Sequence, residues 1–145
     1  MRALYSVQLS EHFWAREFRC KGEIEARPCA CHGAISVDQE LIDVLEAFRA
    51  VYGMPIIITS GFRCDPYNES IGGHPASYHR VGMAADITNT MIRKDLERAA
   101  MQIGEVLEDV IGKGNGNVIA YPNRGFIHCD VGRRVATALV RIKND

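Results

Sequence analysis

The chain has 145 residues, of which 47% are hydrophobic and 24% are charged, and its formal net charge is −1. This composition is ordinary for a globular protein and excludes disordered and fibrous classes. The length suits one domain, residues 1–145, with a real core. A net charge near zero gives no general basic field for nucleic acid, so we expect recognition through a local cleft.

The first predicted element is a helix that starts within residues 36–39 and ends near residue 52. Residues 36–39, Ser-Val-Asp-Gln, have the form of a capping box, and apolar residues recur at helical spacing from Val37 to Val51. The sequence Gly-Met-Pro at residues 53–55 ends the pattern. We expect this helix to belong to the core.

A continuous apolar run at residues 55–59 predicts a buried strand. This strand would deliver Ser-Gly-Phe-Arg, residues 60–63, to the mouth of a cleft. A loop that contains Gly and Pro follows at residues 71–76 and leads to His79. Small residues then let the chain pass close to a ligand before a short strand at residues 84–88.

A second helix is predicted from about residue 91 to residue 111, with its apolar residues on one side. The Gly- and Asn-rich segment 112–117 ends it and turns the chain into a strand at residues 118–121. That strand pairs most simply with residues 126–131 as a hairpin. These elements predict an α+β fold, with helices packed on one side of a small, mainly antiparallel sheet.

The second strand of this hairpin carries polar and apolar residues in alternation. Alternation places His128 and Asp130 on one face and Ile127, Cys129 and Val131 on the other. We expect the apolar face to lie against the core and the polar face to border a cleft.

Three residues, His79, Asp86 and His128, form a candidate metal site. Two imidazoles and one carboxylate suit a borderline cation such as Zn²⁺. Three protein ligands leave a fourth position open for water, which separates catalytic zinc sites from closed structural ones. A single histidine in a loop or on a strand is more often structural, so the prediction depends on the three residues occurring together.

The chain has an odd number of cysteines: Cys20, Cys29, Cys31, Cys64 and Cys129. In an apparently cytoplasmic protein this argues against a disulfide framework. The first three, with His32 or Cys64, have the composition of a second, structural metal site, but Cys-x-Cys spacing is less specific than Cys-x-x-Cys. Reduced, partly buried thiols are the favoured interpretation, with Cys129 in the core. A nucleic-acid-binding zinc module here is disfavoured because few basic residues cluster around it.

Several motifs occur together in the order of a known family. They are Ser60-Gly61-Phe62-Arg63-Cys64, Asn68, Gly72-Gly73, the Ser-x-His-x-x-Gly-x-Ala-x-Asp run that ends at Asp86, and Phe-Ile-His-Cys-Asp-Val-Gly at residues 126–132. Together they resemble the M15 family of zinc peptidases, most closely its short phage and bacterial branch. The resemblance runs from near Phe13 to about Val131. It implies the hedgehog-like fold of D-alanyl-D-alanine carboxypeptidases, murein endopeptidases and phage endolysins.

The resemblance implies a peptidoglycan peptidase that uses one catalytic Zn²⁺. Arg63 would stabilise the oxyanion or clamp a substrate carboxylate, and a salt bridge at a strand end is the alternative. Asn68 and Ser77 would be hydrogen-bonding partners of the substrate, although bracing of a turn or loop explains both equally well.

The general base is not fixed by the sequence. Several relatives carry Glu, Asp or His shortly before the last histidine, where this chain has Gly125 and Phe126. Asp130 shares the face of His128 and is a candidate either to take the proton or to orient the ligand. His74 is another candidate, with a role at the loop surface favoured. The missing base keeps open a non-catalytic zinc-binding module or a virion structural component with the same fold.

Residues 1–10 contain no sustained apolar segment of a secretion signal, and no stretch approaches the ~20 apolar residues of a membrane span. We therefore expect a cytoplasmic monomer, without membrane insertion, that acts on the cell wall after release, as a phage-type endolysin does. Its partner would be bacterial peptidoglycan and not nucleic acid. D,D-carboxypeptidase, D,D-endopeptidase and L-alanyl-D-glutamate endopeptidase activities all stay open.

Overall fold

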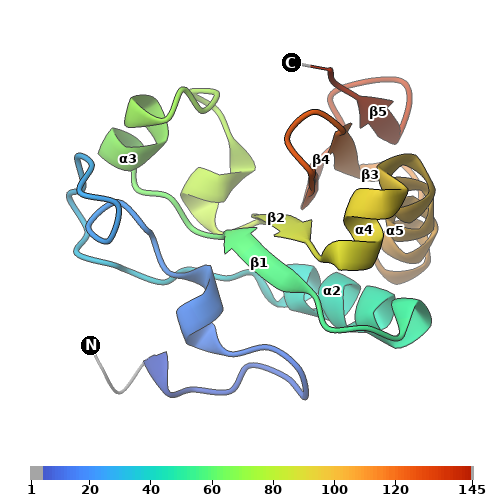
Figure 1. Ribbon diagram of the computed structural model, residues 1–145, viewed down its shortest axis with the longest axis horizontal. Coiled ribbons are helices and arrows are strands. Elements are labelled where there is room, and N and C mark those ends of the chain that lie inside the picture. Colours follow the sequence, from blue (N-terminus) through green and yellow to red (C-terminus); the bar gives the residue numbers. More distant parts are fainter. Residues whose placement is uncertain (1–4, 145) are drawn as a thin grey trace.

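A computed structural model describes residues 5–144 of the chain (Figure 1). The helices are η1 (Ala15–Phe18), α2 (Gln39–Tyr52), α3 (Asp65–Ser70), η2 (Tyr78–Val81), α4 (Thr90–Lys94) and α5 (Leu96–Ile111). The strands are β1 (Ile57–Ser60), β2 (Ala84–Thr88), β3 (Asn115–Tyr121), β4 (Phe126–Arg133) and β5 (Val140–Ile142). This mixture of helices and strands confirms the predicted α+β class.

The strands form one sheet in the order β1-β2-β4-β3-β5. The pairs β1–β2, β2–β4 and β3–β4 are antiparallel, and β5 adds a parallel strand beside β3. The sheet is therefore mainly antiparallel, as predicted, and the predicted hairpin is the β3–β4 pair. The predicted strand at residues 84–88 is β2 with the same bounds.

The core lies between one face of the sheet and the helices α2 and α5 (Figure 1). In β4, Ile127, Cys129 and Val131 point into this core, while the side chains between them point to the opposite face. Burial of these apolar side chains is the main contribution to folding, at about 25 cal/mol per Å² of apolar surface. The sheet therefore has one face left free for polar residues.

Helix α2 begins at Gln39, within the predicted start region 36–39, but its capping residue is not the serine of that region. Its N-cap is Asp38, whose carboxylate accepts a hydrogen bond from the backbone N–H of Glu40, so the helix does not start at Ser36. Gly53 ends it in the left-handed conformation, with φ of 74°. Val51 lies on the solvent side and is 64% exposed, so the apolar stripe is shorter than predicted.

Strand β1 is not the fully buried strand that its apolar run predicted. It lies at the edge of the sheet, and Ile57 is 55% exposed while Ile58 is in the core. Its pairing with β2 shifts between Ile58 and Ser60, so that Thr59 is an extra residue. Such a bulge changes the face on which the next side chain lies, and here it places Ser60 opposite Asp86.

The helix predicted over residues 91–111 is two helices, α4 and α5, separated at Asp95. The backbone of Asp95 is extended, with φ of −153°, and its carboxylate accepts a hydrogen bond from the N–H of Arg98. Asp and Asn favour such N-cap positions because their short side chains satisfy the free N–H groups of the first turn. A residue that ends one helix therefore begins the next, although the apolar pattern continues across it.

We expect Asp95→Ala to lower the free energy of unfolding by about 1 kcal/mol, because the first turn of α5 loses its cap. Asp95→Asn retains a side-chain acceptor and should stay within a few tenths of a kcal/mol of the wild type. Urea unfolding followed by circular dichroism measures both changes. Equal destabilisation by the two substitutions would contradict a capping role for this side chain.

Candidate functional site

Two strands place two of the predicted metal ligands opposite each other on the free face of the sheet. Asp86 of β2 and His128 of β4 are direct partners in the antiparallel register. Opposed residues on one face are close neighbours, so this pairing brings the carboxylate and the imidazole together. His128 and Asp130 lie on the same face, as the alternation predicted, and their side chains are in direct contact.

The third predicted ligand, His79, comes from the short helix η2. Ser77 caps this helix by accepting a hydrogen bond from the N–H of His79, and Gly82 ends it with φ of 75°. A Cβ atom at Gly82 would lie 2.4 Å from a backbone oxygen of Ser36, so only glycine fits this close approach. His79 is buried, with 2% of its surface exposed.

One carboxylate oxygen of Asp86 faces both imidazoles. Asp86 Oδ1 lies 3.1 Å from His79 Nε2 and 3.2 Å from His128 Nδ1. All three ligand atoms lie within 4.8 Å of one another. Tetrahedral zinc with ligand bonds of about 2.0–2.1 Å places its nitrogen and oxygen ligands about 3.3 Å apart. The observed spacing fits that geometry.

The other nitrogen of each imidazole is held by a hydrogen-bond acceptor. His79 Nδ1 donates to the carbonyl oxygen of Gly61 at 2.7 Å, and His128 Nε2 donates to Asp130 Oδ2 at 2.7 Å. A neutral ring that donates at one nitrogen carries a lone pair at the other. When both rings are neutral, their lone pairs point at the carboxylate of Asp86, and the three acceptors converge on a point that suits a cation. The donor set fits a metal ion.

The pKa values of these groups reflect the same arrangement. Burial alone would raise the pKa of Asp86, but the charges and hydrogen bonds of His79 and His128 hold it far below the usual range. Burial alone would lower the pKa of His128, but hydrogen bonds with Asp130 and Asp86 outweigh it and raise this pKa to about 9. For His79 burial prevails, and its pKa is lowered. The site thus stabilises positive charge between its side chains.

Arg63 binds the second oxygen of the same carboxylate. Its Nη2 donates to Asp86 Oδ2 at 2.9 Å, while Nε donates to Ser60 Oγ and Nη1 to Asn68 Oδ1. Three of the five N–H groups of a guanidinium are used in these contacts. The structure therefore contains the salt bridge that the sequence offered as an alternative, and it leaves further N–H groups of Arg63 at the cleft wall.

Asn68 and Ser77 both make bracing contacts in this structure. Asn68 is 2% exposed, and its Nδ2 donates to the carbonyl oxygen of His74 at 2.9 Å. Ser77 Oγ accepts the N–H of His79. His74, the alternative base, uses Nδ1 to accept the N–H of Ala76, so the structure gives its ring a contact within its own loop.

Asp130 is held on both of its oxygens. Oδ2 accepts from His128, and Oδ1 accepts from Asn117 Nδ2 at 2.8 Å and from the N–H of Gly132 at 3.1 Å. The residue is 3% exposed. Carboxylates that hold the far nitrogen of a metal-binding histidine fix its orientation and its tautomer.

A cleft of about 660 Å³ opens beside Asp86 and Arg63. Three further arginines line it, and so does one further carboxylate among the residues that the structure describes: Arg27, Arg93, Arg124 and Glu25. Sequence reasoning missed these four, because they come from three distant segments and none belongs to a local motif. Four arginines against two carboxylates give the cleft an excess of positive charge.

The segment that carries Arg63 is held between η1 and η2. The N–H of Phe62 donates to the carbonyl of Phe18, and the N–H of Arg63 donates to the carbonyl of His79. Gly61 lies in the middle, where a Cβ atom would come within 2.6 Å of Phe18 Cα. This close approach positions the Gly61 carbonyl that holds His79.

We expect Gly61→Ala to weaken metal binding by about 10- to 100-fold, because the added methyl group pushes the Gly61 carbonyl away from His79. The same overpacking should cost about 1–3 kcal/mol of stability. Competition with a chromogenic chelator measures the affinity, and thermal unfolding measures the stability. Wild-type affinity in a folded variant would contradict the role given to this carbonyl.

Among residues 5–144, no helix is long and apolar enough to cross a membrane.

Comparison with known proteins gives one family for this chain. A family model described as Peptidase M15 matches residues 11–130, which include all three candidate ligands, Arg63 and Asp130. No curated protein matches the chain.

Proposed function

Because the chain belongs to the Peptidase M15 family, we propose that it is a zinc-dependent peptidase that cleaves the peptide part of bacterial peptidoglycan. Members of this family are metallopeptidases and are in general zinc-dependent. The observation that carries the proposal is the convergence of His79, Asp86 and His128 on one point within a buried, hydrogen-bonded frame.

In this proposal the three residues hold a catalytic Zn²⁺ by His79 Nε2, Asp86 Oδ1 and His128 Nδ1. Bound zinc supplies a nucleophile from water near neutral pH and polarises the scissile carbonyl. The hydrogen bonds of Gly61 and Asp130 keep both imidazole lone pairs directed at the ion position. Asp130 then acts as a positioning residue, since both its oxygens are already occupied by protein donors.

Arg63 has two roles in this proposal. It orients Asp86 through Oδ2, and its remaining N–H groups stabilise negative charge that develops on the substrate oxygen. The guanidinium suits this because it stays charged and presents its donors in a fixed plane. Asn68 supports this arrangement by accepting a hydrogen bond from Nη1 of Arg63, and the substrate contact expected of Asn68 stays a prediction.

The charge of the cleft supports an anionic peptide as substrate. Peptidoglycan stem peptides carry free carboxylates, and the arginines of the cleft provide planar donors that match them. Arg124 lies over the ring of Phe126, with 5.0 Å between its Cζ and the ring centroid, and this contact helps to hold it at the cleft wall. As part of the proposal, the enzyme acts in the manner of a phage-type endolysin.

We expect the zinc-loaded protein to release fragments from purified bacterial sacculi, and a chelator to stop the release. Mass spectrometry of the new termini identifies the bond, and so separates D,D-carboxypeptidase, D,D-endopeptidase and L-alanyl-D-glutamate endopeptidase activities. His128→Ala should lose the catalytic zinc and fragment release together, since one of three ligands is gone.

His12→Ala is the matched control, because His12 lies outside the site and pairs with Glu46. This variant should keep both zinc and activity. A zinc-loaded wild type that leaves muropeptides unchanged would overturn the peptidase and leave the non-catalytic zinc-binding module.

Asp130→Asn distinguishes a positioning residue from a general base. If Asp130 orients His128, the variant should bind zinc about 10- to 100-fold more weakly and recover most of its turnover when zinc is saturating. A general base would give the opposite pattern, with normal zinc affinity and turnover reduced by ~100-fold or more. Zinc titration and fragment release, measured on the same preparation, separate the two patterns.

A further inference from the structure

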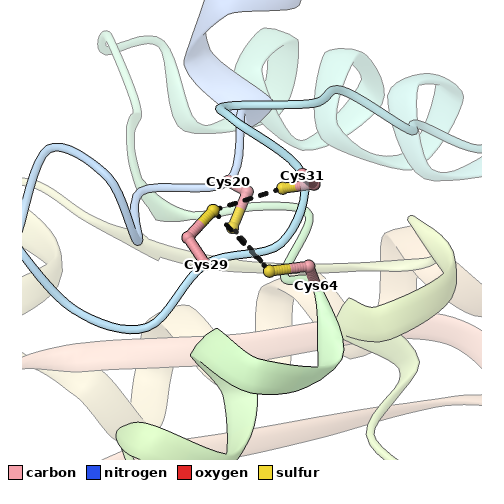
Figure 2. A group of neighbouring side chains, drawn as sticks. All are labelled: Cys20, Cys29, Cys31 and Cys64. Carbon is pink, nitrogen blue, oxygen red and sulfur yellow. Dashed lines mark hydrogen bonds between the residues drawn. The ribbon is translucent and has the colours of Figure 1, made fainter.

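Four of the five cysteines converge at a second place in the molecule (Figure 2). Cys20 follows η1, Cys29 and Cys31 lie in the loop before α2, and Cys64 is the N-cap of α3. Their sulfur atoms all lie within 4.8 Å of one another. Three separate segments thus place their cysteine thiols around a common centre.

The sulfur separations match a tetrahedral metal site. The Sγ–Sγ distances are 3.5 Å for Cys29–Cys31, 3.7 Å for Cys20–Cys64 and 3.8 Å for Cys64–Cys29. Zinc with four thiolates has Zn–S bonds of about 2.3 Å, which places the sulfurs about 3.8 Å apart. The cluster needs little rearrangement to enclose an ion.

The surroundings of the sulfurs provide a second, independent observation. Cys20 is fully buried and Cys64 is buried, while Cys29 and Cys31 are half-buried, so the sulfur cluster lies largely away from solvent. The contacts also form one connected group, because Cys64 contacts both Cys20 and Cys29, and Cys29 contacts Cys31. Weak S–H···S bonds explain a pair of thiols more readily than a group of four.

The loop that carries three of these cysteines has little other structure. Residues 19–38, between η1 and α2, form turns and bends but no helix or strand. Long connections without secondary structure usually need another source of stability. Cys20 is fully buried, and Tyr67 of α3 packs beside it with Cys64. A metal ion would join this loop to α3.

We propose that Cys20, Cys29, Cys31 and Cys64 bind a structural zinc ion, distinct from the candidate site at His79, Asp86 and His128. Four thiolates close the coordination sphere and leave no position for substrate, which is typical of structural zinc. Binding releases the thiol protons to solvent and requires no oxidant or reductant. His32, which the sequence offered as a ligand, instead points to Glu23 and takes no part.

The consequence for the molecule follows from the position of Cys64. It comes directly after Arg63 and directly before α3, which carries Asn68. Lys21, next to Cys20, donates to the carbonyl oxygens of Ile58 and Thr59 in β1. A zinc ion bound by these cysteines would therefore help to hold the segment between β1 and α3 in place.

The test is metal content combined with cobalt spectroscopy of the whole chain. Purified wild type should contain two zinc ions per chain. His128→Ala should contain one, and the double variant Cys29→Ser with Cys31→Ser should also contain one. After exchange with Co²⁺, wild type and His128→Ala should show an intense thiolate-to-cobalt charge-transfer band, and the double cysteine variant should lose it.

Cys129→Ala is the matched control, because this cysteine faces the core between β4 and the helices, outside the cluster. It should keep both ions and the band. A single zinc ion in wild type that His128→Ala loses and the double cysteine variant keeps, no charge-transfer band in wild type, or disulfides detected by intact mass in place of metal would each overturn the structural site. The wild-type spectrum decides the matter even if the double variant fails to fold. If wild type lacks only the ion that His79, Asp86 and His128 would bind, this result contradicts the proposed function and leaves the structural site unaffected.

Discussion

The organisation of the site depends on one buried carboxylate. Asp86 offers Oδ1 to two imidazoles and Oδ2 to Arg63, while only 6% of its surface is exposed. A buried charge is costly unless every lone pair has a partner, so β4, η2 and the segment after β1 must all be in place to satisfy it. The frame around the ligands follows from this need, because each partner of Asp86 is itself held by a backbone carbonyl or a polar side chain.

The sequence predicted those parts of the site that lie within single segments. Alternation in β4 correctly separated His128 and Asp130 from the core residues, because side chains of a strand point to opposite faces whatever the strand pairs with. The same reasoning failed for β1, where an apolar run predicted full burial and the strand lies at an edge. Hydrophobicity reports how much a residue gains by burial, but not which neighbours the fold provides.

Other features depend on contacts between distant segments, and no local pattern contains them. The break at Asp95 gives no signal in the apolar spacing, which continues from α4 into α5. The arginines of the cleft come from separate loops and elements. The spacing of Cys29 and Cys31 is weak evidence alone and gains meaning only when the fold brings Cys20 and Cys64 beside it. Tertiary structure was therefore needed to find the charge of the cleft and to place Cys64, and not His32, beside the other three cysteines.

The bulge in β1 makes the number of residues a constraint at Thr59, besides the hydrogen bond that its hydroxyl donates to the carbonyl of Asp86. Removing this residue would shift every later residue of the strand by one position and so turn its side chain to the other face of the sheet. Ser60 would then leave the face of Asp86, and Arg63 would lose its path to the carboxylate. Natural variation at this point should therefore keep the number of residues from Ile58 to Arg63 constant.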